Sequence, residues 1–378
     1  MNVRILLLLT VAVLGIGAAA YYFGEENKAV YSEAFEPGPM FPGLLARVND
    51  IDEARVESQE GGVVTLQKRD GHWAVAEQYG YRANPERVSG LLRKTAAVEK
   101  IEQKTAKPEN HERLRLDDPA GENSLATRIT LKAGETTEAD IVVGLNTPAD
   151  HGGGAFVRLW GEDQTWLTEG TYNPHKAVIE YLDRTVVNID GRRMKSARIQ
   201  HMAKDDGAVA EMVTISSDAP DQEAYSLGAA IPEGGKPKPD HELSSVIRLP
   251  DFLVFEDVRP ATEINGKPKV VAVYETFDGL RVTLSATEEG EATWVTLTAD
   301  TVERAPGLDA FVTEHKGKDT DSGRIADQMK SAEEIAEEAE AIAAGAEGWA
   351  YKLTDYKTGR LTVATADVVE KPEAAAQQ

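Results

Sequence analysis

One uncharged apolar segment near the start of the chain constrains its fold more than any other sequence feature. Residues 5–24 read ILLLLTVAVLGIGAAAYYFG and contain no charged side chain. As a helix rising about 1.5 Å per residue, the segment would cover the ~30 Å hydrocarbon core of a bilayer. Arg4 precedes it, and Tyr21 and Tyr22 stand near its far end. Positive charge inside and aromatic side chains at the interface predict a transmembrane helix with its amino terminus in the cytoplasm.

The same segment allows two other interpretations. Gly15, Gly17 and Ala20 form a G-x-G-x-x-A pattern, which also occurs at the start of dinucleotide-binding folds. Those folds need an amphipathic helix after the glycines, whereas here apolar residues and then the prolines of residues 37–42 follow, so we favour a membrane segment. The alanines at 18–20 fit a signal-peptidase site. The apolar run extends beyond them, which favours an uncleaved anchor but leaves cleavage open.

Composition limits the partners and the chemistry. The 378 residues include 41 Lys and Arg against 64 Asp and Glu, which gives a formal net charge of −23. Residues 1–24 hold one charged side chain, Arg4, and without it the rest of the chain carries −24. Such a surface repels phosphate backbones, so we predict no nucleic-acid partner. The chain has no cysteine, which excludes disulfides, thiol catalysis and a lipidated amino-terminal cysteine.

We predict an α+β fold: two related modules of mostly antiparallel sheet with packed helices, preceded by one N-terminal transmembrane helix. Short alternating apolar segments indicate the strands, the first over 48–56, and Asn-Pro pairs at 84–85 and 173–174 indicate two capped helices. The predicted parts are a membrane anchor or signal segment at 1–24, a Pro-containing tether at 25–43, a first module at 44–185, a second module at 186–305, a C-terminal amphipathic helix and packed tail at 306–370, and a disordered end at 371–378.

Short internal matches in a common order favour a tandem duplication. The matching pairs are residues 54–56 with 197–199, 64–66 with 213–215, 98–101 with 255–258, and 128–131 with 281–284. Each match is short and typical of β-rich sequences, so their common order carries the hypothesis.

We predict no catalytic, cofactor-binding or metal-binding residues. His151 opens an H-G-G-G stretch like an esterase oxyanion loop, but the chain has no G-x-S-x-G nucleophile pentapeptide. Residues 319–323 resemble the start of a calcium loop, but its twelfth position is Lys330 instead of a bidentate glutamate. We instead expect Asp321 or Ser322 to cap the following helix. The seven histidines show no zinc-binding spacing.

Two further features have open interpretations. Trp160 and Trp166 lie on the two arms of a predicted hairpin and could share one face, either in the core or lining an exposed binding surface. A helix predicted over 323–344 has one apolar stripe and an acidic face that includes Glu333, Glu334, Glu337 and Glu338. It is interpreted as a docked helix with a solvated face, with a partner-binding helix as the alternative.

Several longer stretches, taken together, resemble a known family. They are FPGLLARVNDI from Phe41, DGHWAVAEQYGYRANPERV from Asp70, KTAKPENHERLRLDDPA from Lys104, FVRLWGEDQTWL from Phe156, YLDR from Tyr181 and LPDFLVFEDVRPA from Leu249. This combination, over about 41–305, resembles the bacterial family known as domain of unknown function 4340. The family often has Trp before L-D-R, where this chain has Tyr181.

The resemblance implies a setting and no catalytic residues. Members of the family look like single-anchor envelope proteins, often encoded with ABC-type transport components similar to those named for gliding motility. We therefore expect a non-catalytic accessory or scaffold protein of a transport-type membrane assembly, with ABC-type permease components as partners. The expected location is the bacterial inner membrane, single-pass, with the bulk of the chain in the periplasm. The alternative is a periplasmic binding module for a polymer or small ligand, and the oligomeric state is left open.

Overall fold

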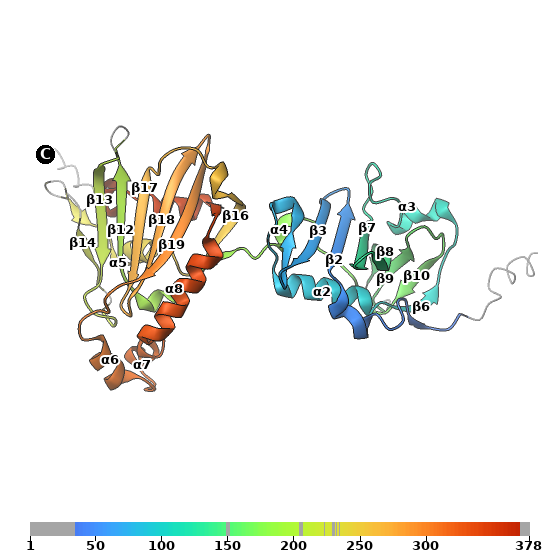
Figure 1. Cartoon of the computed structure of the whole chain (residues 1–378), viewed down its shortest axis with the longest axis horizontal. Helices are drawn as coiled ribbons and strands as arrows, with labels where there is room; N and C mark the ends of the chain where they lie inside the picture. Colours follow the sequence, from blue (N-terminus) through green and yellow to red (C-terminus); the bar gives the residue numbers. More distant parts are fainter. Residues whose placement is uncertain are drawn as a thin grey trace, which may run out of the picture. The chain divides into compact units, whose positions relative to one another are not determined.

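The computed structural model describes residues 35–148, 152–203, 207–222, 224–228, 231, 233 and 235–370 (Figure 1). In this described part the fold is α+β with antiparallel sheets, as predicted. None of its helices has the length and apolar character needed to cross a membrane. The predicted anchor at 5–24, His151 and the predicted end at 371–378 lie outside the described residues.

The chain forms two compact units that are each discontinuous in sequence. Of the described residues, the first unit holds those up to Thr65 together with Ser89–Lys176, and the second holds Leu66–Val88 and those from Ala177 onward. The segment 306–370 therefore belongs to the second unit. The module boundaries drawn from the sequence remain predictions, because a compact unit need not coincide with a duplicated module.

In the described residues the first sheet has ten strands, and its strand pairs of described register are antiparallel. In spatial order the strands are β1 (Gly38–Pro39), β6 (Glu99–Gln103), β10 (Thr165–Thr168), β9 (Gly154–Leu159), β8 (Thr136–Thr147), β7 (Thr127–Ala133), β2 (Glu53–Ser58), β3 (Gly62–Arg69), β4 (His72–Val75) and β5 (Tyr81–Arg82). Since β1 pairs with β6, this part of the predicted tether at 25–43 is bound to the sheet.

Where the structure describes the chain, the second sheet has nine antiparallel strands. In spatial order they are β11 (Thr185–Val187), β16 (Leu253–Pro260), β20 (Trp349–Leu353), β19 (Ala292–Thr301), β18 (Leu280–Glu289), β17 (Val270–Thr276), β12 (Met194–Met202), β13 (Val209–Ser216) and β14 (Ser226–Gly228). A separate pair joins β15 (Lys236–Pro237) to β21 (Val369–Glu370).

The helices are short apart from α2 and α8. The α-helices are α2 (Pro85–Ala96), α3 (His111–Leu114), α4 (Val178–Tyr181), α5 (Asp240–Ile247), α6 (Leu308–His315), α7 (Asp321–Ala326), α8 (Ala332–Ala346), α9 (Asp355–Leu361) and α10 (Thr365–Val368). The 3₁₀ helices are η1 (Leu45–Asp50), η2 (Ala76–Gln78), η3 (Pro108–Asn110), η5 (Gly191–Arg193) and η6 (Ala261–Glu263).

The two sheets have the same strand order. Read from the edge at β1 or β11, the first sheet runs β1-β6-β10-β9-β8-β7-β2-β3-β4 and the second runs β11-β16-β20-β19-β18-β17-β12-β13-β14. A helix, α2 or α5, precedes the second strand from that edge in each case. Sequence matches 54–56 with 197–199, 64–66 with 213–215, and 98–101 with 255–258 fall on corresponding elements.

The fourth match, of 128–131 with 281–284, is wrong, because its two segments do not lie on corresponding strands. Arg128 lies on β7, whose counterpart is β17, whereas Arg281 lies on β18. Neighbouring strands that bury one face carry the same alternating pattern, so a tetrapeptide match cannot distinguish a strand from the next one.

Three predicted elements differ from the structure. The strand expected over 48–56 begins at Glu53, after η1. The helix expected from 173 is confined to α4, because the Asn173 side chain accepts a hydrogen bond from Asn146 Nδ2 at 2.6 Å instead of capping a helix. The helix expected over 323–344 is divided into α7 and α8. Ser331 begins α8 with a capping box, in which Glu334 Oε2 accepts from the Ser331 amide at 2.8 Å.

One face of the second sheet forms the core of its unit. On β17 and β18, Tyr274 pairs with Val282 and Ala272 pairs with Leu284, and all four are at most 1% exposed. Helix α8 lies along β19 (Figure 1) and buries Ile335. The stripe predicted for this helix is therefore docked, as interpreted from the sequence.

Candidate functional site: a polar cavity in the second unit

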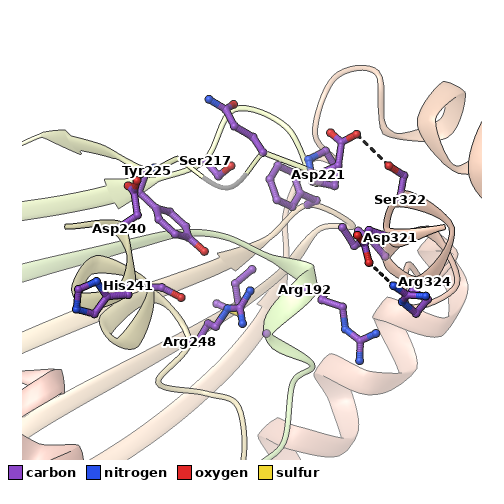
Figure 2. A pocket seen from close by; sticks show the side chains of 17 residues that line it. Arg192, Ser217, Asp221, Tyr225, Asp240, His241, Arg248, Asp321, Ser322 and Arg324 are labelled. Atoms are coloured by element: carbon purple, nitrogen blue, oxygen red, sulfur yellow. Dashed lines mark hydrogen bonds and ion pairs between the residues drawn. The ribbon is translucent and has the colours of Figure 1, made fainter.

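A polar cavity of about 610 Å³ in the second unit is the candidate functional site (Figure 2). It lies among η5, the β13–β14 connection, α5, the β17–β18 turn and α7. Three arginines (Arg192, Arg248 and Arg324) and three aspartates (Asp221, Asp240 and Asp321) line it. Its volume is within the usual range of small-molecule sites.

Two hydrogen bonds hold the β13–β14 connection over the cavity. The Tyr225 amide donates to Asp240 Oδ1 at 3.0 Å, which ties the connection to the first turn of α5. Ser322 Oγ donates to Asp221 Oδ2 at 3.3 Å, which ties it to α7, and Figure 2 marks this bond. The connection therefore has one fixed contact on each side of the cavity.

Helix α7 brings Asp321 and Ser322 to the cavity because a different residue caps it. Thr320 Oγ1 accepts from the Gly323 amide at 3.0 Å, so the predicted cap at Asp321 or Ser322 is wrong. A side chain at Gly323 would place its Cβ 1.9 Å from the Lys318 carbonyl oxygen, so this turn requires glycine. The two residues after the cap are then free of the capping role and line the cavity.

A buried ion network fixes the wall of the cavity behind η5 and α7. Arg193 is 2% exposed; its Nε lies 2.8 Å from Asp278 Oδ2 and its Nη2 lies 2.6 Å from Glu338 Oε2. Asp278, which is 1% exposed, also accepts from the Lys330 amide at 3.0 Å. The network therefore joins η5, the β17–β18 turn, the α7–α8 connection and α8.

Glu338 differs from the other acidic residues of α8. Glu333 and Glu337 are exposed, as predicted for a solvated acidic face, but Glu338 points into the network. Burial alone would raise the pKa of Glu338, yet hydrogen bonds from Arg193 and Lys330 hold this pKa below its usual value. The carboxylate is therefore ionised and bound at neutral pH.

Two arginines of the cavity are neutralised within the chain. Arg192 lies beside Asp190, with Nη2 and Oδ2 3.0 Å apart. Arg324 pairs with Asp321, three residues earlier on α7, as Figure 2 shows. These pairs leave Arg248, Asp221 and Asp240 as the lining charges to be considered for a ligand.

Trp160 and Trp166, which the sequence allowed on one face of a hairpin, lie on opposite faces of the sheet. Trp166 pairs with Val157 in the β9–β10 register, whereas Trp160 packs with Phe156, which pairs with Leu167. Successive residues of a strand face opposite sides, so the two indole rings lie on opposite faces of the sheet. Both are half-buried.

Sequence reasoning missed the cavity altogether. Its charged residues come from segments as distant as η5, α5 and α7, and no local spacing connects them. Across the described part of the chain, no three His, Asp or Glu side chains are grouped closely enough to hold a metal ion.

The fold and the cavity define a class: an antiparallel α+β protein with two sheets of common strand order and a polar cavity in the second unit. Residues 73–249 match the family model described as Domain of unknown function (DUF4340), the family that the sequence resembles. The match includes the cavity residues from Gly191 to Arg248 and ends before α7. No curated protein matches the chain.

Proposed function

We propose that the chain is a membrane-tethered extracytoplasmic accessory protein of a transport-type assembly, which binds its partners without transforming them. The observation that carries the proposal is the charge-free apolar segment at 5–24 ahead of residues 25–378, which carry −24. A segment of this length and composition partitions into a bilayer, and Arg4 before it orients the remaining chain away from the cytoplasm. The ABC-type permease partner is proposed from the family resemblance.

A single anchor would act by confinement. Residues 25–37 lie between the proposed anchor and β1, and an unstructured linker of this length would have an end-to-end distance of about 20 Å. Confinement near the bilayer raises the effective concentration of the folded units toward a membrane partner, so weak contacts suffice.

We also propose that the two sheets arose by tandem duplication. The common strand order and the matched segments support this proposal. In the first sheet residues 160–164 connect β9 to β10, whereas in the second residues 302–348 connect the corresponding β19 and β20. This longer connection contains α6, α7 and α8, and so it supplies one wall of the cavity.

Two experiments test the location and the tether. Alkaline phosphatase fused after Gln378, which is active outside the cytoplasm, should be active, and the same fusion lacking residues 5–24 should be inactive. In a deletion strain, a chain exported by a cleavable signal in place of residues 1–24 should fold but fail to restore function. An inactive full-length fusion contradicts export, and complete rescue by the released chain contradicts the tether.

A second candidate function is a ligand-binding module. The cavity favours it, because donor and acceptor side chains from four parts of the second unit line one space of ligand size. The two candidates are compatible, since an anchored accessory protein can carry a ligand site.

A further inference from the structure

We propose that the cavity of the second unit binds an uncharged, polyhydroxylated ligand, namely a sugar or a sugar unit of a polysaccharide. The inference rests on the ligand-binding candidate and not on the anchor. It follows from the balance of hydrogen-bond donors and acceptors that line the cavity (Figure 2).

The donor side of the cavity is Arg248. In the part of the chain that the structure describes, its guanidinium makes no ion pair and no hydrogen bond, unlike Arg192 and Arg324, which are paired with aspartates. Asp251 lies near the same side chain but forms no ion pair with it. A guanidinium carries five N–H donors and no acceptor, so this group offers donors alone to a ligand.

Packing places Arg248, without an ion pair. The Arg248 amide donates to the Ser244 carbonyl oxygen at 3.0 Å at the end of α5. A Cβ added at Gly191 would lie 2.9 Å from Arg248 Cδ, so the aliphatic part of the arginine packs directly on the η5 backbone. Figure 2 shows the Arg248 side chain and the Tyr225 hydroxyl directed toward the same part of the cavity.

The acceptor side consists of Asp221 and Asp240. Each uses one carboxylate oxygen within the chain: Asp221 Oδ2 accepts from Ser322, and Asp240 Oδ1 accepts from Tyr225. Their other oxygens accept no hydrogen bond from any residue that the structure describes, so each offers an acceptor alone to a ligand.

This combination favours a ligand that both donates and accepts hydrogen bonds over one that carries a charge. An anion would be attracted by Arg248 but repelled by Asp221 and Asp240. A cation would be attracted by the two aspartates, but an ammonium group only donates hydrogen bonds, so it would leave the Arg248 donors without an acceptor. A hydroxyl group both donates and accepts, so a ligand with several hydroxyls can satisfy Arg248 and both aspartates at once. The net charge of −23 opposes an anionic ligand further and leaves a neutral one unaffected. The Tyr225 ring adds apolar surface for one face of a sugar ring.

The test compares sugars that share a ring and differ in charge. The full-length chain is titrated with glucose, galactose, mannose and N-acetylglucosamine, and with glucuronate and glucosamine as charged relatives, using saturation-transfer NMR and calorimetry. At least one neutral sugar should bind, and it should bind more tightly than either charged relative. Arg248→Gln should weaken that binding about ten- to hundredfold, the usual cost of losing hydrogen bonds to a charged group.

Matched variants separate binding from folding. Gly191→Ala, which displaces Arg248, should weaken binding as well, whereas Arg198→Gln on the exposed side of β12 should bind like the native chain. The thermal midpoint of each variant shows whether it is folded. The proposal is overturned if none of the four neutral sugars binds at 50 mM, if glucuronate or glucosamine binds best, or if folded Arg248→Gln binds normally. None of these results bears on the anchor, which the export assay tests separately.

Discussion

At the scale of single residues, two buried tyrosine hydroxyls provide a matched comparison. The Tyr172 hydroxyl lies 2.6 Å from Thr95 Oγ1, whereas the Tyr274 hydroxyl, on a residue 1% exposed, has no hydrogen-bond partner among the described residues. Burial raises the pKa of both, and the Thr95 hydrogen bond opposes the rise at Tyr172. Both are therefore neutral phenols at physiological pH, and their hydrogen bonds alone distinguish them.

We predict opposite outcomes for their phenylalanine variants. Tyr274→Phe removes a buried polar group without a partner, so it should leave the free energy of unfolding unchanged or raise it by up to about 1 kcal/mol. Tyr172→Phe removes a made hydrogen bond and should lower it by about 1 kcal/mol. Urea unfolding measures both. A larger loss for Tyr274→Phe than for Tyr172→Phe would show that the Tyr274 hydroxyl has a partner.

Burial that follows from the local spacing of residues was predictable, and burial that depends on distant contacts was not. The stripe of Leu91, Leu92 and Thr95 on α2 is buried, as its helical spacing indicates. Arg193 is buried beside its exposed neighbour Arg192, and nothing local distinguishes these two arginines. The difference arises from Asp278, 85 positions away in the chain.

At the scale of elements, the same limit appears in the helices. Ser331 and Glu334 match the sequence pattern of a capping box, which marks the start of a helix. The apolar stripe continues through this position, however, and so it predicted one helix where the structure has α7 and α8. The break is held by tertiary bonds: Arg304 Nη1 donates to the Lys330 carbonyl oxygen at 2.7 Å, and the Lys330 amide donates to Asp278. The cavity wall on α7 depends on this break and was therefore not predictable from periodicity.

The docking of α8 can be tested through Arg193. Arg193→Ala would leave Asp278 buried without a cation and Glu338 with Lys330 alone, and breaking a buried pair typically costs about 3–5 kcal/mol. Arg192→Ala removes an exposed arginine paired with Asp190 and should cost about 0–1 kcal/mol. Chemical unfolding gives the free energies, and hydrogen exchange should show lost protection in α8. Equal effects of the two variants would contradict a role for the network in docking α8.

At the scale of the whole molecule, the chain completes its second sheet late. Strand β20 lies between β16 and β19, although residues 302–348 separate it from β19 in sequence. The corresponding β10 of the first sheet pairs with β9 across the short connection at 160–164. Composition and alternation predicted the antiparallel α+β class and a packed tail within 306–370, but alternation does not specify strand order. That order depends on long-range contacts, which also slow folding.

The last strand should therefore be essential to the second unit. Tyr351 on β20 is 1% exposed, pairs with Val258 and Val295, and lies 5.5 Å from the Phe255 ring, measured between ring centroids. Tyr351→Ala should lower the free energy of unfolding of the second unit by about 3–5 kcal/mol, as for other large-to-small core changes. Tyr356→Ala, at a tyrosine 62% exposed on α9, should change it by at most about 0.5 kcal/mol.

Hydrogen exchange followed by mass spectrometry measures this effect strand by strand in the full-length chain. In Tyr351→Ala, protection should fall in β16 and β19, the two neighbours of β20, as well as in β20 itself, because a central strand supplies hydrogen bonds to both sides. In Tyr356→Ala, protection in these three strands should match the native chain. Loss of protection confined to β20 would mean that the rest of the second sheet is stable without β20, which would contradict an essential role for this strand.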